Sequence, residues 1–161
     1  MFKVGDLAVY PAHGIGVIEA IETKELSGMK KQFYIMRILE NDMIIMIPTD
    51  NVKTVGLRPI LSKEEVPKVY AILQDRSEPS NSEFSWNKRY RDYVDRLKTG
   101  SVCEVAEVLR DLVALREEKE LSFGEKKLLE TARKLLVKEL SIAQECSEEL
   151  VDNKIKQILN L

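Results

Sequence analysis

The side chains that most often carry catalysis or bind metals are scarce in this chain. It contains one histidine, His13, and two cysteines, Cys103 and Cys146, without CxxC or HxxxH spacing. Zinc sites and catalysis by Ser–His–Asp or Cys–His groups need more of these residues than the chain offers. We therefore expect no metal site and no enzyme, and we interpret both cysteines as free thiols in a reducing compartment.

The sequence GIG at residues 14–16 is the one glycine motif that invites comparison with a phosphate-binding loop. It lacks the third glycine and the following helix of a dinucleotide-binding loop, and the chain has no GxxxxGK[ST] sequence. A tight turn that needs positive φ is the better interpretation, with His13 as a turn residue. No cofactor is predicted.

An aromatic and basic segment, residues 84–98 (FSWNKRYRDYVDRLK), is the strongest candidate for a binding function. It carries five basic and two acidic side chains, and a helix is predicted from Trp86 to Lys98. One helical stripe contains Trp86, Tyr90, Tyr93, Val94 and Leu97. Such stripes are usually core, yet a Trp at the first helical residue beside Lys88, Arg89 and Arg91 also suits a minor-groove wedge. The residues alone leave these two interpretations level.

Two neighbouring predicted strands, residues 32–39 and 43–48, are apolar on both faces. Ile35 and Arg37 share one face with Phe33, and Met46 and Pro48 share a face of the second strand with Ile44. A small barrel has one interior, so the outer face is either covered by the rest of the chain or is a protein-docking surface. In the second case the strand edge would be open to β-augmentation, and Pro48 would mark where the ladder stops.

These candidate sites belong to two regions of different character, predicted as domains 1–60 and 61–161. In the first, strands are predicted at 7–10, 16–25, 32–39 and 43–48, with a short fifth at 52–55. Five short strands joined by tight turns predict a small Tudor-like or SH3-like β-barrel. The fold class is therefore α+β, with the barrel followed by an all-helical domain of about five helices.

Helix starts in the second region are marked by capping boxes, which pair a Ser with a Glu three residues later. These boxes are Ser62 with Glu65, Ser101 with Glu104, and Ser122 with Glu125, and Ser147 precedes the last helix. The first helix should run to Leu73 and bury Val66, Val69, Tyr70 and Leu73. A polar, serine-rich loop is predicted at 75–85.

Charge and hydropathy exclude several classes of protein. The 161 residues include 25 Lys and Arg against 27 Asp and Glu, a net charge of −2, so the chain does not coat nucleic acid by bulk positive charge. No run approaches the roughly 18 apolar residues of a membrane helix, and no secretory signal is visible. A cytoplasmic protein with no membrane contact is expected.

Several motifs, in order along the chain, resemble the CarD/CdnL family of bacterial transcription regulators. They are FKVGDLAVYPAHGIG (2–16), FYIMRIL (33–39), MIPTDNV (46–52), VGLR (55–58), WNKRYR (86–91), KTGSV (98–102), AEVLRDL (106–112) and LSFGEKKLL (121–129). The resemblance runs essentially end to end. The N-terminal half alone is similar to the polymerase-interacting module of transcription-repair coupling factors.

The resemblance implies a non-enzymatic regulator in which the N-terminal domain docks on the β1 lobe of the RNA polymerase β subunit. By position, we expect Ile35, Arg37, Met46 and Pro48 to make this contact, with Lys24 near it. Some family members have an Arg where Met46 stands. Because Met46 cannot form that ion pair, docking here should depend more on apolar packing and backbone pairing.

The resemblance also implies that Trp86 wedges into the minor groove of promoter DNA near the −10 element, at the upstream edge of the bubble, and stabilises the open complex. Lys88, Arg89 and Arg91 would hold the DNA backbone, and Val94 and Phe123 would support DNA binding or domain packing. No sequence-specific readout is expected, and a monomer suffices. The alternative is a polymerase adaptor with Trp86 buried and no contact with DNA.

Overall fold

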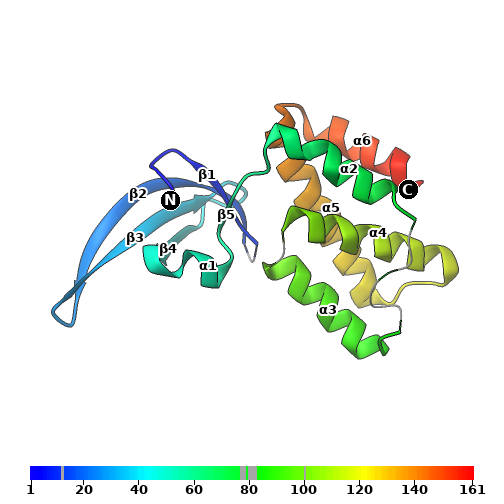
Figure 1. Cartoon of the computed structure of the whole chain (residues 1–161), viewed down its shortest axis with the longest axis horizontal. Coiled ribbons are helices and arrows are strands. Elements are labelled where there is room, and N and C mark those ends of the chain that lie inside the picture. Colours follow the sequence, from blue (N-terminus) through cyan, green and yellow to red (C-terminus); the bar gives the residue numbers. More distant parts are fainter. Residues whose placement is uncertain (12, 77–78, 80–82, 100) are drawn as a thin grey trace. The chain divides into compact units, whose positions relative to one another are not determined.

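The computed structural model describes residues 1–11, 13–76, 79, 83–99 and 101–161. Within them the chain separates into two compact units, Met1–Ile60 and Leu61–Leu161 (Figure 1). Parts of the predicted turn at 11–14 and of the predicted loop at 75–85 lie outside the described residues. Each unit is described by itself below.

The first unit is one antiparallel sheet of five strands. Their bounds are β1 Leu7–Tyr10, β2 Gly14–Leu26, β3 Met29–Ile38, β4 Ile44–Pro48 and β5 Arg58–Pro59, in the spatial order β4-β3-β2-β1-β5. The four longer strands confirm the predicted ones. The turn before β2 needs a left-handed residue, and Gly14 supplies it with φ 108°.

Strands β2 and β3 form a long hairpin that continues beyond the neighbouring strands (Figure 1). Its two-residue turn consists of Ser27 and Gly28, both with positive φ (52° and 78°), as in a type I′ turn whose twist matches the strands. β4 pairs with β3 only as far as Phe33, so the hairpin beyond Phe33 and Glu22 has no further strand beside it. Side chains there are exposed on both faces.

Alternation along β3 buries Tyr34, Met36 and Ile38 against Ala8, Ile18, Ile47 and Leu57, which form the core of this unit. A β-bulge inserts Glu19 between the pairs Ile18–Met36 and Ala20–Ile35. Gly16 is required where β2 crosses this core. A Cβ there would lie 2.7 Å from the Arg37 carbonyl oxygen and from the Met36 methyl carbon.

Two details of the predicted barrel are wrong. Residues Val52–Val55 are not a strand but a single helical turn, α1, which follows the 3-10 turn η1 (Thr49–Asn51) and ends at the left-handed Gly56. The fifth strand is instead β5. The sheet is also open, because its end strands β4 and β5 each pair with one neighbour and the helical turns occupy the chain that would have joined them.

In its described residues, the second unit consists of five helices after a 3-10 turn, η2 (Lys63–Glu65). They are α2 Val66–Gln74, α3 Trp86–Thr99, α4 Val102–Glu118, α5 Phe123–Gln144 and α6 Glu148–Leu159 (Figure 1). The predicted capping boxes at Ser101 and Ser122 are both formed, and Ser147 caps α6 through the Leu150 N–H. The predicted box at Ser62 is absent: its hydroxyl donates to the Glu65 carboxylate (2.9 Å) and the chain makes a 3-10 turn.

The helices enclose one apolar core. As predicted, α2 buries Val66, Val69, Tyr70 and Leu73. The start of the unit is anchored by Leu61, whose backbone N–H donates to the buried Glu139 carboxylate (2.9 Å). Among the described residues, no helix is long and apolar enough to cross a membrane, and no group of three or more His, Cys, Asp or Glu is arranged to hold a metal ion.

Candidate functional site

The residues predicted to dock on a protein partner lie on one face of the sheet. We call it the outer sheet face, and define it by the side chains directed away from the core on β3 and β4: Phe33, Ile35, Arg37, Ile44, Met46 and Pro48. In the β3–β4 register Ile35 lies opposite Met46, and Phe33 lies opposite Pro48. Met46 and Ile44 are exposed to 43% and 52%, Ile35 and Pro48 are half-buried and Phe33 is buried, so the apolar face is open to solvent mainly at Ile44 and Met46.

Charged groups border this apolar face. The Lys24 ammonium reaches across from β2 to the Met46 sulfur (3.8 Å). At the other end Arg37 forms ion pairs with Glu19, in the bulge, and with Asp42 at 3.0 Å. The structure thus brings together all five predicted residues: Lys24, Ile35, Arg37, Met46 and Pro48. Sequence reasoning left out Ile44, although alternation along β4 already grouped it with Met46 and Pro48.

The backbone of β4 adds a second element to the outer sheet face. The hydrogen bond from the Ile38 N–H to the Met43 carbonyl (2.8 Å) sets the phase of the β3–β4 ladder. Consequently Ile45 and Ile47 bond toward β3, and the backbone groups of Ile44 and Met46 point to the open edge of the sheet. That edge can accept another strand, and Pro48, which has no N–H, limits its length.

The second candidate site is at the start of α3. Ser85 caps this helix, because its hydroxyl accepts from the Lys88 N–H (3.3 Å) and its carbonyl accepts from the Arg89 N–H (2.9 Å). Trp86 is therefore the first helical residue. It remains 46% exposed, whereas Tyr93 and Leu97 further along the same stripe are buried. The stripe was compatible with either a buried or an exposed Trp86, and the structure does not place Trp86 in the core.

An aromatic partner orders the exposed Trp86 ring. It stacks on Tyr90, with ring centroids 5.5 Å apart and an interplanar angle of 16°. Tyr90 in turn packs on α5, where a Cβ on Gly124 would lie 3.0 Å from its ring. Next to Gly124, the first residue of α5 is Phe123, which is 85% exposed. Two capped helix starts, each carrying an exposed aromatic residue, are thus joined through Tyr90.

The predicted cations differ in their availability. Lys88 is exposed and its ammonium lies over the Phe84 ring (4.2 Å), and Arg91 is exposed with no partner among the described residues. Arg89 is largely buried and lies 3.9 Å from the buried Glu125 carboxylate. Val94 is half-buried. Sequence reasoning missed Tyr90, Phe84 and Glu125 as parts of this site, although Tyr90 follows Trp86 by one helical turn.

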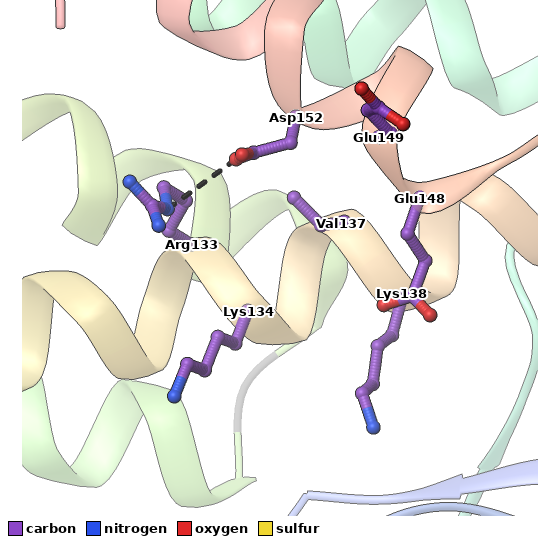
Figure 2. Close-up of a pocket in the computed structure, with 7 residues that line it drawn as sticks. All are labelled: Arg133, Lys134, Val137, Lys138, Glu148, Glu149 and Asp152. Carbon is purple, nitrogen blue, oxygen red and sulfur yellow. Dashed lines mark ion pairs between the residues drawn. The ribbon is translucent and has the colours of Figure 1, made fainter.

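A third feature is the pocket between α5 and the start of α6 shown in Figure 2, with a volume of about 320 Å³. Arg133 and Asp152 are paired across it, with Nε and Oδ1 3.4 Å apart. The other lining residues are Lys134, Val137, Lys138, Glu148 and Glu149. None of the residues predicted for binding lines this pocket, and its mixed charges favour no single class of ligand.

Comparison with known proteins covers both units. Residues 2–61 match the CarD-like/TRCF RID domain, and residues 68–156 match the CarD C-terminal domain. The Bacillus subtilis (strain 168) protein YdeB, named as a candidate transcription factor, is 38% identical over 151 residues, which are 94% of this chain and 97% of YdeB.

Two solved structures from Myxococcus xanthus are similar to part of this chain. CdnLNt is 53% identical, with a TM-score of 0.34, and the match covers 38% of this chain and 87% of that one. The 72-residue N-terminal domain of CarD is 37% identical, with a TM-score of 0.32, covering 37% and 79%. With both family domains present in order and a relative matched over nearly its whole length, the chain belongs to the CarD-like family of transcription factors.

Proposed function

We propose that this protein docks on the β1 lobe of the RNA polymerase β subunit and stabilises the open promoter complex. The outer sheet face makes the protein contact. Trp86 enters the minor groove at the upstream edge of the bubble, near the −10 element, and Lys88 and Arg91 contact the phosphates with help from Arg89. Membership of the CarD-like family supports a polymerase-interacting transcription factor, and the exposure of Trp86, Ile44 and Met46 supports the finer assignment.

The exposure of Trp86 is the observation on which the proposal depends most. A tryptophan left 46% exposed at a helix start, instead of joining the core stripe, retains apolar surface for a partner. A side chain inserted between base steps unstacks them at a cost of a few kcal/mol. At the edge of a melted bubble part of that cost has already been met, so Trp86 should prefer the bubble edge over closed duplex.

Docking through the outer sheet face accounts for its composition. Ile44 and Met46 supply exposed apolar area, and their backbone groups at the open edge can pair with a strand of the polymerase. Met46 carries no charge and Arg37 is engaged by Glu19 and Asp42. The contact is therefore dominated by apolar packing and backbone hydrogen bonds, and its affinity should fall only modestly with added salt.

The charge of α3 is too small for independent binding to DNA. The helix carries Lys88, Arg89, Arg91, Arg96 and Lys98 against Asp92 and Asp95, an excess of three positive charges. Few phosphates would be neutralised, so the affinity for free DNA should be weak. Docking on the polymerase makes the DNA contact intramolecular, with an effective concentration of roughly millimolar order.

Replacing Trp86 tests the DNA contact. We expect Trp86→Ala to shorten the lifetime of the open complex while polymerase binding and the free energy of unfolding stay unchanged. Leu150→Ala, which removes another exposed apolar side chain from the same unit, is the matched control. An unchanged lifetime for Trp86→Ala would instead favour the alternative, a polymerase adaptor without DNA contact.

Replacing two isoleucines tests the docking face. Ile35 lies on the outer sheet face, whereas Ile21 lies opposite Tyr34 on the other face and is 37% exposed. We expect Ile35→Ala, and Pro48→Ala with it, to weaken a pull-down with the β1 lobe, while Ile21→Ala binds normally. Retained binding by both outer-face variants would rule out this interface.

A further inference from the structure

The Trp86 ring has a defined place because a chain of contacts leads from it into the helical unit. Trp86 stacks on Tyr90 at 5.5 Å, and Tyr90 lies against Gly124 in the first turn of α5. The Tyr90 ring atoms Cε2 and Cζ and its hydroxyl oxygen would be 3.0, 3.4 and 3.3 Å from a Cβ at position 124. A side chain at position 124 would therefore require the Tyr90 ring to shift by a few tenths of an ångström.

Glycine is otherwise unfavourable at this place. Gly124 is the second residue of a 22-residue helix, and no positive φ requires it. In the middle of a helix glycine is less stable than alanine by about 0.5–1 kcal/mol, and in the first turn the difference has the same sign but is smaller. A helical glycine whose missing side chain is replaced by the ring of a neighbouring helix is explained by that close contact.

An ion pair beside this contact holds the same two helices. Arg89, the residue before Tyr90, lies 3.9 Å from Glu125, the residue after Gly124. Both side chains are largely buried, and Glu125 is fixed by the capping box with Ser122 (Ser122 N–H to carboxylate, 3.0 Å). The orientation of α3 at Tyr90 is thus set by the first turn of α5.

We propose that Tyr90, seated on Gly124, is a positioning residue that presets the Trp86 ring for its target. The stack holds one face of the indole and leaves the rest exposed, so less ring mobility has to be lost on binding. The Arg89–Glu125 pair contributes by locking the helix that carries Tyr90. The link to promoter DNA rests on the function proposed above, whereas the placement of Trp86 in the free protein does not.

The test uses Trp86 as its own probe, because it is the one tryptophan in the chain. Acrylamide quenching of its fluorescence in the free protein measures how accessible the ring is. We expect Tyr90→Leu and Gly124→Ala to raise the quenching constant, and Tyr90→Phe, which keeps the ring, to leave it unchanged. Lys127→Ala, an exposed substitution on the same helix, is the matched control for Gly124→Ala.

Stability separates positioning from a merely structural role. Gly124→Ala improves helix propensity while displacing Tyr90, so the change in quenching should appear without the loss of stability that a damaged core would produce. In open-complex assays the same variant should shorten the lifetime by at most about tenfold, the limit set by the full loss of one aromatic pair.

The outcomes distinguish the two proposals. Unchanged quenching in both Tyr90→Leu and Gly124→Ala would show that Tyr90 does not position Trp86, whatever Trp86 does on DNA. Altered quenching in Gly124→Ala, together with a Trp86→Ala variant of normal open-complex lifetime, would support the positioning role and overturn the proposed function. If Tyr90→Leu does not fold, Gly124→Ala still decides the first question.

Discussion

Glu125 is the residue that links the capping of α5 to the placement of α3. It is 2% exposed, accepts the Ser122 N–H and lies 3.9 Å from Arg89. Burial alone would raise the pKa of Glu125, but hydrogen bonds with Ser122 and the positive charges of Lys119 and Arg89 outweigh this effect and hold the pKa below its ordinary value. The folded state thus favours the ionised form.

A pH dependence of stability follows from this lowered pKa. Above the unfolded-state value of about 4.3, ionised Glu125 stabilises the fold fully, and the stabilisation is lost as the pH falls through the folded-state value. Glu125→Gln keeps a capping acceptor but removes the charge, so it should lower the free energy of unfolding at pH 7 by about 0.5–1 kcal/mol and make the loss in acid smaller. Urea denaturation at pH 7 and in acid measures both.

The matched control is Glu104→Gln, at the same position of the capping box of α4. That box is exposed to solvent, so the substitution should alter the acid dependence less. If Glu125→Gln and the unmodified protein lose the same free energy of unfolding between the two pH values, the charge of Glu125 does not contribute to the acid dependence of stability.

At the scale of elements, two adjacent lysines of the β2–β3 hairpin, Lys30 and Lys31, lie on opposite faces of the sheet. Lys31 lies opposite Lys24, on the same side as Ile35 and Met46, whereas Lys30 lies opposite Glu25 on the other side. Directly opposed like charges destabilise a strand pair, and opposed unlike charges stabilise it. The Lys24–Lys31 pair should therefore lower stability in the free protein, and an acidic group of a partner at this border of the apolar contact would offset that cost.

Opposite effects on stability and binding are expected for these two lysines. Lys31→Gln should leave the free energy of unfolding unchanged or slightly higher and weaken binding to the polymerase β subunit by up to about fivefold at low salt. Lys30→Gln should lower the free energy of unfolding by a few tenths of a kcal/mol and leave binding to the polymerase β subunit unchanged. Urea denaturation and binding titrations at two salt concentrations check this, and equal binding by the two variants would contradict it.

The elements also show what could be read from the sequence. Capping boxes located the starts of α4 and α5, because the two reciprocal hydrogen bonds are local. Alternation grouped the outer-face residues correctly. Val52–Val55 was mistaken for a strand because its β-branched residues favour strands, whereas the left-handed Gly56 ends a helical turn there. The sequence left the burial of Trp86 undecided. Periodicity shows which face of α3 a residue lies on, but not how deeply the first residue of the helix is buried. That depends on the contact between Tyr90 and Gly124 of α5, which is distant in the sequence.

At the scale of the whole molecule, neither of the two units carries a large net charge. Residues 1–60 carry 7 basic and 7 acidic side chains, and residues 61–161 carry 18 and 20, so neither unit is strongly attracted to DNA by its net charge. Under the proposed function, the local excess on α3 would become effective only when the first unit brings it to the promoter. Stronger overall charge would retain the protein on non-promoter DNA.

Lengthening the connection between the units tests this dependence on tethering. A flexible Gly-Ser insertion after Ile60 leaves the Leu61 N–H, which donates to Glu139 at 2.9 Å, in place. Binding to the polymerase should be unchanged, because the outer sheet face is intact.

The effective concentration of the second unit at the DNA falls roughly as the −3/2 power of linker length. An insertion of about 24 residues should therefore give about threefold less DNA contact at equilibrium than an insertion of about 12. Open-complex lifetimes at subsaturating protein measure this, and lifetimes independent of insertion length would show that the DNA contact does not depend on the tether.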